Sequence, residues 1–299
     1  MNESAPPTES GEFNPPVLDP QAPGLPLAHR GKVRNIYAVG ADRLLLVASD
    51  RLSAFDSVLP SGVPDKGRIL SRLAAFWFEQ TEQLMPNHLI SASWPEISRT
   101  VGLDPGLRDL AGRSMLVKRA ERIDVECVMR GYLAGSGWAE YRAHGTLAGV
   151  PLPPGLRQGD PLPIPAFTPA LKNDEGHDEN VTTERLAARI GADLADRLER
   201  ASRDLYTFAA RYARTRGIIL ADTKFEFGLV DGSLMLIDEA LTPDSSRFWD
   251  AATHQPGTAP TSFDKQPIRD YLSSLGWRGE GPAPALPRAV IAETVERYR

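Results

Sequence analysis

The chain has 299 residues, which is enough for one large domain or for two lobes around a sizeable core. Its composition, 41% hydrophobic and 24% charged, is that of a globular protein, and its net charge of −5 gives no reason to expect nucleic acid as a partner. A single cysteine excludes an internal disulfide and any zinc site built on several cysteines, and no apolar run is long enough to cross a membrane. No secretory signal is visible, so we expect a cytoplasmic enzyme.

The N-terminal segment, residues 1–28, is rich in Pro, Glu, Ser and Asn, and we expect it to be disordered or loosely draped. Order should begin near His29, where two strands, 32–39 and 43–49, read as a hairpin. Gly31 permits close backbone approach, and Lys32 and Arg34 share a face on which they can hold phosphate oxygens. The alternative is a solvated basic edge strand.

The middle of the chain reads as a helix over 68–84, strands over 114–119 and 123–133, and a helix that Gly145 closes. The polar break at 120–122 suits a link between two lobes, 29–120 and 121–299. Ser136 is either the N-cap of the helix or, with Arg130 nearby, part of a phosphate site at its N-terminus. Cys127 lies in an apolar run and is expected to be a buried, inert thiol.

A charged hairpin lies in the second half, after helices over 182–190 and up to Arg216. From Asp222 to Leu229 apolar and charged residues alternate, which predicts a strand with Asp222, Lys224 and Glu226 on one face. Carboxylates gathered in this way attract Mg²⁺, which completes its shell with water and substrate phosphates. The alternative is an ordinary surface hairpin with a solvated polar face.

The length of the turn after this strand decides which carboxylates meet. A two-residue turn, Asp231-Gly232, pairs Glu226 with Ile237 and Lys224 with Glu239. A three-residue turn, 231–233, instead places Asp238 opposite Glu226. The pattern leaves both open. Helices over 264–275 and 288–298 close an α+β chain with two lobes and a cleft between them.

Six blocks of the sequence, in this order, resemble the family of phosphoribosylaminoimidazole-succinocarboxamide synthases (SAICAR synthetases), in its longer form. The resemblance runs from about Gly31 to Leu272. The blocks are 31–37 (GKVRNIY), 50–56 (DRLSAFD), 125–138 (VECVMRGYLAGSGW), 221–228 (ADTKFEFG), 238–247 (DEALTPDSSR) and 262–266 (SFDKQ).

The resemblance implies an N-terminal antiparallel β-sheet lobe and a C-terminal ATP-grasp-like α+β lobe, with the active site between them. It implies a ligase of purine (IMP) biosynthesis that joins carboxyaminoimidazole ribotide (CAIR) to L-aspartate and converts ATP to ADP and phosphate, by way of an acyl phosphate. ATP and Mg²⁺ are the implied cosubstrate and cofactor. We expect small-molecule substrates only, no nucleic acid or membrane partner, and a monomer or small homo-oligomer.

The resemblance also assigns roles to residues that match the family's motifs. The ATP-binding set is Gly31, Lys32, Arg34, Lys118, Glu121 and Lys172. The metal pair is Glu226 and Asp238, and the ribotide set is Arg130, Ser136, Asp222 and Arg247. For catalysis or substrate positioning we add Lys224, and also Asp178, which lies outside the matching motifs.

The choice of Asp238 for the metal selects the three-residue turn. The general base for the aspartate amine stays open between Asp178 and a substrate phosphate oxygen. Two other functions compete with the synthetase: another ATP-dependent carboxylate ligase or kinase on the same scaffold, and a non-catalytic nucleotide-binding module. A degenerate module would have lost some of its metal carboxylates or cations, and this chain retains them.

Overall fold

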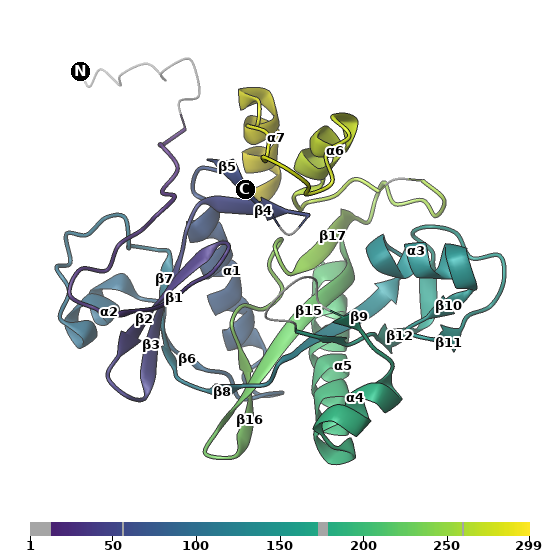
Figure 1. Ribbon diagram of the computed structural model, residues 1–299, viewed down its shortest axis with the longest axis horizontal. Coiled ribbons are helices and arrows are strands. Elements are labelled where there is room, and N and C mark those ends of the chain that lie inside the picture. Colours follow the sequence, from purple (N-terminus) through teal and green to yellow (C-terminus); the bar gives the residue numbers. More distant parts are fainter. Residues whose placement is uncertain (1–12, 56, 173–178, 259) are drawn as a thin grey trace, which may run out of the picture.

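The computed structural model describes residues 13–55, 57–172, 179–258 and 260–299 (Figure 1). The N-terminal part contains a five-stranded antiparallel sheet. Its strands, in spatial order, are β1 (Leu27–Arg30), β2 (Arg34–Val39), β3 (Arg43–Ala48), β7 (Ser114–Lys118) and β6 (Leu89–Ser91). Helix α2 (Trp94–Val101) packs on one face of this sheet, and α1 (Lys66–Gln80) packs on the other.

The second sheet is larger, and β15 (Ile218–Val230) runs through its middle. Neighbouring strands are antiparallel. The other strands of this sheet are β8 (Glu121–Arg122), β9 (Val125–Tyr132), β12 (Pro161–Phe167), β13 (Ala170–Leu171), β14 (Glu179–Asn180), β16 (Ser233–Ile237) and β17 (Ser246–Asp250). Of these, β8, β9, β16 and β17 pair with β15 itself. Helix α5 (Ala192–Arg214), preceded by α4 (Thr183–Ile190), packs across β9, β12 and β15. This α+β architecture with two antiparallel sheets confirms the predicted fold class.

The alternation predicted for β15 is confirmed by what its two faces contact. Phe225 and Phe227 are fully buried in the main core, which also includes residues of α1, α5 and β9. Lys224 and Glu226 point from the opposite face toward the space between the two sheets. Strand β9 alternates in the same way, with Cys127 fully buried, where burial raises the pKa of its thiol well above the ordinary value.

The predicted three-residue turn is wrong. Val230 pairs with Ser233 and Glu226 with Ile237, so the turn consists of Asp231 and Gly232 alone. Both residues have positive φ, 51° and 76°, as a tight hairpin turn of the primed kind requires. Strand β16 then ends at Ile237, and Asp238, at φ 66°, turns the chain out of the ladder.

The two parts are joined through a short segment before β6. Leu236 of β16 donates its N–H to the carbonyl of Pro86 (2.9 Å) and accepts from the N–H of His88 (3.1 Å). The carbonyl of His88 accepts in turn from the N–H of Lys118 at the end of β7 (2.8 Å). These backbone bonds fix the end of one sheet against the hairpin of the other. The predicted division at residues 120 and 121 stays a prediction.

The expectation that order begins near His29 is wrong. Residues 1–12 lie outside the described ranges, but Phe13 packs with the C-terminal helices, and residues 17–25 pack along the first sheet. The N–H of Asp50 bonds to the carbonyl of Val17 (2.8 Å), and the carbonyl of Pro20 accepts from the side chains of Asn35 (3.0 Å) and Tyr37 (2.9 Å). Polar composition did not reveal these contacts, because they use the backbone of the segment.

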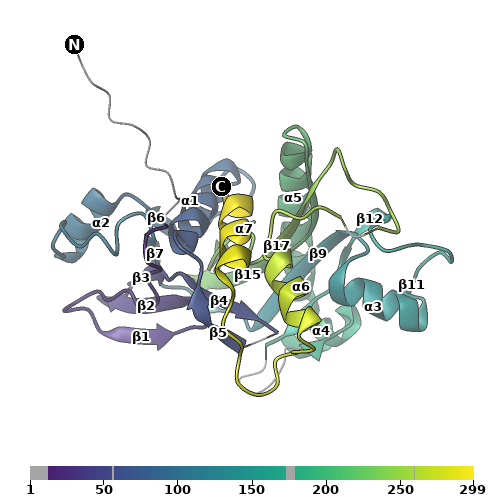
Figure 2. The ribbon, with the colours of Figure 1, turned by 90° about the horizontal axis from the view of Figure 1, so that it is seen from above.

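Two small units complete the fold. Helix α3 (Gly135–His144) is followed by the hairpin of β10 (Thr146–Leu147) and β11 (Val150–Pro151), and α3 ends at Gly145 as predicted. The hairpin of β4 (Arg51–Ala54) and β5 (Ser57–Gly62) packs with α6 (Gln266–Ser274) and α7 (Arg288–Tyr298) around a separate apolar core (Figures 1 and 2). Among the described residues, no helix has the length and apolarity that a membrane span requires.

We expect Arg113→Met to destabilise the first sheet strongly. Arg113 and Asp50 are each about 1% exposed and form two hydrogen bonds, at 2.8 and 3.1 Å. Removing one partner leaves the other charge buried, which costs about 3–5 kcal/mol of unfolding free energy. Urea unfolding measures this loss. The exposed Arg108→Met should change stability by less than about 0.5 kcal/mol, and an equally small loss for Arg113→Met would contradict the expectation.

Candidate active site between the two sheets

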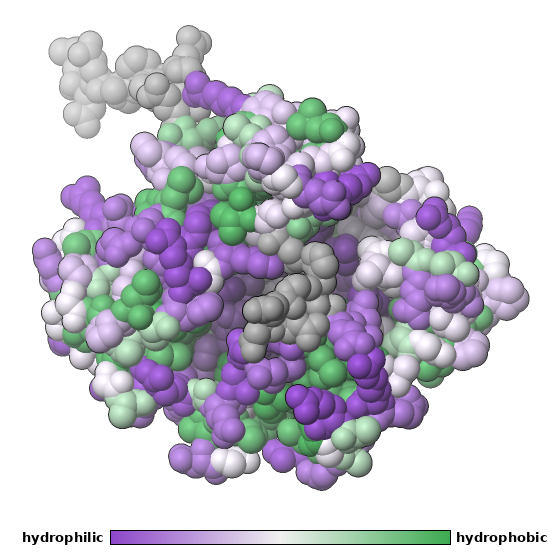
Figure 3. Space-filling model, viewed as in Figure 1, coloured by the Kyte–Doolittle hydropathy of each residue, from purple (hydrophilic) through white to green (hydrophobic). Residues whose placement is uncertain are grey.

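A cavity of about 380 Å³, here called the interlobe cavity, lies between the two sheets. Residues of β2, β3 and β7 line one side, and residues of β15 and β16 line the other. Hydrophilic residues surround the hollow near the centre of the face in Figure 3. The lining includes most of the residues predicted to bind ATP and metal: Gly31, Lys32, Arg34, Lys118, Lys172, Glu226 and Asp238. Lys224, predicted to act in catalysis or substrate positioning, lines it too. Apolar side chains that include Ile36, Leu44, Val117 and Ile237 complete it.

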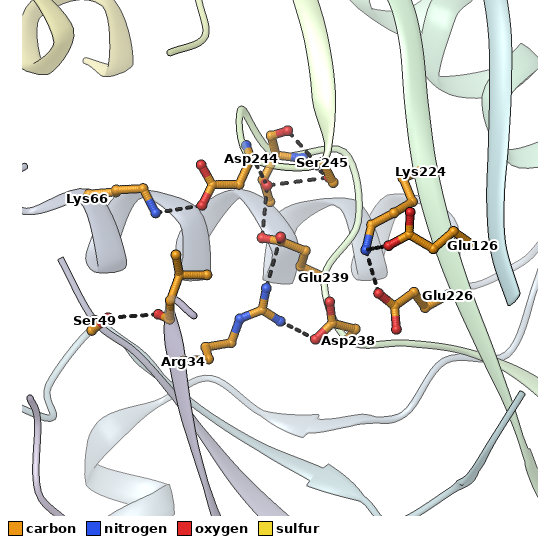
Figure 4. A network of polar contacts seen from close by, with 12 residues as sticks. Arg34, Ser49, Lys66, Glu126, Lys224, Glu226, Asp238, Glu239, Asp244 and Ser245 are labelled. Carbon is orange, nitrogen blue, oxygen red and sulfur yellow. Dashed lines mark hydrogen bonds and ion pairs between the residues drawn. The ribbon is translucent and has the colours of Figure 1, made fainter. Parts of the chain in front are cut away.

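Arg34 connects the two sides of this cavity. Its guanidinium extends from β2 and forms ion pairs with the carboxylates of Asp238 and of Glu239, the latter at 2.9 Å (Figure 4). Burial alone would lower the pKa of Arg34, but Asp238 and Glu239 outweigh it and raise the pKa above its ordinary value. Burial raises the pKa of Glu239, and Arg34 offsets this only in part because two further carboxylates, Asp238 and Asp244, lie nearby.

A second charge cluster lies across the strands β9 and β15. The ammonium of Lys224 donates to Glu126 at 2.9 Å and also to Glu226, and the ammonium of Lys172 donates to Glu226 at 2.6 Å. Burial would raise the pKa of Glu226, but Lys224 and Lys172 outweigh it and lower the pKa to about 2. Glu226 is therefore ionised at neutral pH, which a metal ligand requires.

The donor chemistry of the cavity suits Mg²⁺. Glu226 and Asp238 line the same space beside several cations, and Mg²⁺ is usually bound by one or two carboxylates together with substrate phosphates. Within the described residues, no group of three or more His, Cys, Asp or Glu side chains is arranged to hold a metal ion. The protein groups therefore fit a metal that arrives with phosphate better than one held in an all-protein cage.

The residues predicted to hold the ribotide are brought together around Arg130. The carboxylate of Asp222 accepts from Arg130 at 3.0 Å and also from Arg247, and Arg130 donates to the hydroxyl of Ser136 at 3.0 Å. Arg130 and Ser136 line a cavity of about 330 Å³, here called the Arg130 cavity, between α3, Thr168 and Asn180. Burial lowers the pKa of Arg130, which Asp222 only partly offsets.

Two glycines allow the arginines to approach the start of α3. A Cβ on Gly135, which has φ 53°, would lie 2.3 Å from the guanidinium of Arg247, and one on Gly137 would lie 3.2 Å from Arg130. Ser136 is the second residue of α3 and does not cap it, because the N-cap is Ala134. The N-cap interpretation of Ser136 is thus wrong, and its hydroxyl instead fixes Arg130 at a helix N-terminus, where anions are favoured.

Three of the predicted site residues that the structure describes, Glu121, Asp222 and Arg247, line neither cavity. Glu121 is exposed on β8 and does not line the interlobe cavity, although its neighbours Ala120 and Arg122 do. Asp178 lies outside the described residues. Of the ribotide set, Asp222 and Arg247 do not line the Arg130 cavity: Asp222 accepts a hydrogen bond from Arg130, and Arg247 donates to Asp222.

Sequence reasoning missed His88 and the roles of Glu126 and Glu239. His88 is 4% exposed, lines the interlobe cavity and stacks edge-on against Phe78. Burial, together with Arg34, lowers the pKa of its imidazole to about 3, so the ring is neutral at physiological pH. No sequence pattern identifies His88 as a site residue. Glu126 could have been predicted, because it shares one face of β9 with Arg130.

We expect the contribution of Glu226 to stability to depend on pH. A carboxylate whose folded pKa is lowered from 4.5 to about 2 stabilises the protein above about pH 4.5 and loses this contribution as the pH falls toward 2. The stability advantage of the wild type over Glu226→Gln, on the order of 2–3 kcal/mol at neutral pH, should therefore shrink between pH 4.5 and 3. Urea unfolding at several pH values measures it. The exposed Glu82→Gln serves as control, and an advantage that stays constant with pH would refute the expectation.

The chain matches proteins of one known family over most of its length. The model of the SAICAR synthetase family matches residues 27–284. A phosphoribosylaminoimidazole-succinocarboxamide synthase from Elusimicrobium minutum is 50% identical over 277 residues, which are 92% of this chain and 94% of that protein.

Solved structures agree with this result. An SAICAR synthase from Saccharomyces cerevisiae, complexed with SAICAR, superposes with a TM-score of 0.84 at 38% identity, over 94% of this chain and 95% of the other. An SAICAR synthetase in complex with ADP superposes with a TM-score of 0.64 at 26% identity, over 86% of this chain and 99% of the other.

Proposed function

The chain belongs to the SAICAR synthetase family, and on this premise we infer the reaction and the roles of its residues. The protein is an ADP-forming ligase of purine biosynthesis that joins CAIR to L-aspartate at the expense of ATP and yields SAICAR, ADP and phosphate. The observation that carries this function is the match with synthetases of this name at about half identity over nearly the whole chain. The two cavities with their cations and carboxylates support it.

The chemistry of amide formation explains why ATP is needed. A carboxylate is a poor acyl donor because its leaving group would be oxide. We propose that phosphoryl transfer from ATP converts the CAIR carboxylate to an acyl phosphate, from which phosphate leaves when the neutral amine of L-aspartate attacks. For such a transfer the protein has to position the reactants and stabilise the charge of the transition state, and covalent catalysis by protein groups matters less.

The interlobe cavity is the proposed ATP site. Its apolar wall suits a base, and Lys32, Arg34 and Lys172 supply cations for the phosphates. The ADP complex of a relative supports this assignment of ligand class. Glu226 and Asp238 would hold Mg²⁺, which supplies positive charge to the transferring phosphoryl group when bound. In the free protein both carboxylates are neutralised by cations of the site, Arg34 for Asp238 and Lys172 with Lys224 for Glu226.

The Arg130 cavity is the proposed site for the ribotide. Arg130 and the N-terminus of α3 favour a phosphate, and Arg247 lies at the opening that Gly135 leaves. Asp222 orients both arginines through the hydrogen bonds that it accepts from them. The SAICAR complex of the yeast relative supports a product site in this fold. Asp178 and a substrate phosphate oxygen remain the candidates for the base that accepts the amine proton.

We also propose that the enzyme works in the cytoplasm, where purine precursors are made, as a monomer or small homo-oligomer. Its substrates would be CAIR, L-aspartate and ATP only. The absence of a spanning helix among the described residues is compatible with this placement.

The function is tested by omitting substrates one at a time. We expect ADP release and SAICAR formation with ATP, Mg²⁺, CAIR and L-aspartate together, and near-background SAICAR when either acid is omitted. Without CAIR no acyl phosphate forms, and without L-aspartate the acyl phosphate has no amine acceptor. Coupled detection of ADP with chromatographic detection of SAICAR measures both products. Rapid ADP release that is independent of L-aspartate would overturn the synthetase assignment in favour of a kinase.

The metal role of Asp238 is tested by Asp238→Asn. We expect the Mg²⁺ concentration for half-maximal SAICAR formation to rise by roughly tenfold or more, since even residues behind a metal ligand affect metal affinity by this amount. The matched control is Asp231→Asn, an exposed residue in the turn of the same hairpin, where asparagine tolerates positive φ. An unchanged Mg²⁺ requirement in folded Asp238→Asn would remove Asp238 from the metal site.

A further inference from the structure

The loop of residues 238–245, between β16 and β17, serves both proposed sites. Asp238 and Glu239 at its start face Arg34, and Arg247 follows two residues after its end. The backbone of the loop is unusual, because Asp238 and Leu241 have φ of 66° and 57°, a region that residues other than glycine rarely adopt. Such a conformation persists only where surrounding contacts impose it.

Hydrogen bonds within the loop account for part of its shape. The hydroxyl of Thr242 donates to Glu239 at 2.9 Å and accepts from the N–H of Asp244 at 3.2 Å, and the N–H of Thr242 donates to Ser245 at 3.1 Å. These bonds tie Glu239 to Asp244. They do not fix the loop relative to the rest of the protein.

Arg34 holds the start of the loop through Asp238 and Glu239, and the N–H of Lys224 donates to the carbonyl of Ser245 at its end (2.8 Å). Asp244 attaches the middle of the loop to two further segments. Its carboxylate lies 2.5 Å from the ammonium of Lys66, as Figure 4 shows, and 3.7 Å from that of Lys265. The side chains of Lys66, Asp244 and Lys265 are 0%, 6% and 10% exposed. Neither lysine lines the interlobe cavity or the Arg130 cavity.

The two lysines come from different parts of the fold. Lys66 is the first residue of α1, and the N–H of the next residue, Gly67, donates to Asp50 at 2.8 Å, which Arg113 holds in turn. Lys265 is the N-cap residue of α6 and belongs to the C-terminal helices. Asp244 thus joins the loop to α1 on one side and to α6 on the other.

Stability alone is a weak explanation for this cluster. Burial lowers the pKa of Lys265, and burial would also raise the pKa of Asp244, but Lys66 and Lys265 outweigh it and hold that pKa well below its ordinary value. Replacing buried ion clusters with apolar side chains is often neutral or stabilising in other proteins. A cluster that joins three segments at one carboxylate is better explained by the fixed position that it gives the loop.

We propose that Lys66, Asp244 and Lys265 form a clamp of positioning residues that sets the 238–245 loop for the reaction. The clamp holds Asp238 toward the phosphates of ATP and Arg247 toward the ribotide, and it makes the C-terminal helices part of the active-site support. It also gives a role to the middle of the block 238–247 and to the block 262–266. This inference rests on the proposed function.

The test uses Lys265→Met and Lys66→Met in the full-length chain. We expect kcat for SAICAR formation to fall roughly 10- to 100-fold, because small displacements of positioned groups have effects of this size. The Mg²⁺ concentration for half-maximal activity should rise with it, because Asp238 is displaced. The melting temperature should change by only a few degrees, and Lys265→Arg should restore most of the activity.

Hydrogen–deuterium exchange supplies a readout that needs no substrate. In the free protein we expect faster amide exchange across residues 238–246 in both methionine variants and unchanged exchange in the α5 helix. Arg288→Met, an exposed position at the start of α7, is the matched control and should behave as the wild type.

Folded variants with wild-type kcat, Mg²⁺ requirement and loop exchange would overturn the clamp. If Lys66→Met does not fold, Lys265→Met and Lys265→Gln decide alone, because Lys265 is the more distant partner of Asp244. If the wild type forms no SAICAR, the proposed function fails, and loop exchange still tests the clamp separately.

Discussion

The burial of charge along one face of β15 is the constraint on which the rest of the structure depends. Asp222 and Glu226 are 4% and 5% exposed, and a charge removed from water in this way is costly unless it is paired. Each therefore has a cationic partner from another segment: Arg130 and Arg247 for Asp222, and Lys172 for Glu226. These ion pairs link β9, β17 and the end of β13 to β15, and the two cavities lie beside them.

Arg34 has a corresponding role between the lobes. It is the residue of the first sheet that pairs with Asp238 and Glu239, so the arrangement of the two sheets and the charge balance of the cavity depend on the same guanidinium. A metal bound at Asp238 has to compete with this ion pair. We infer that the phosphates of ATP attract Arg34 and bring Mg²⁺ with them. The ion pair between Arg34 and Asp238 is then replaced by pairs of Arg34 with phosphate and of Asp238 with Mg²⁺.

Much of the fold and of the site was predictable because it depends on local patterns. The alternation on β9 and β15 determines which side chains face the core, and glycines and capping residues determine where α3, α4 and α5 end. The predicted residues Lys32, Arg34, Lys172, Glu226 and Asp238 meet in one cavity, and Arg130, Ser136, Asp222 and Arg247 meet in one hydrogen-bonded cluster. Packing of the segment after Phe13 was not predictable, because it combines backbone hydrogen bonds with scattered apolar side chains such as Ala22 and Leu25, which form no periodic pattern.

The sequence by itself determined that Asp222, Lys224 and Glu226 share one face of a strand, because side chains alternate with a period of two whatever the surroundings. Only the tertiary structure decided what happens after the turn. The two-residue turn places Ile237 opposite Glu226, yet Asp238 still reaches the cavity, because the chain leaves the ladder at a positive φ and Arg34 attracts its carboxylate from the other sheet. Local pattern cannot encode that contact, since its partners are 204 residues apart and meet only when both lobes are folded.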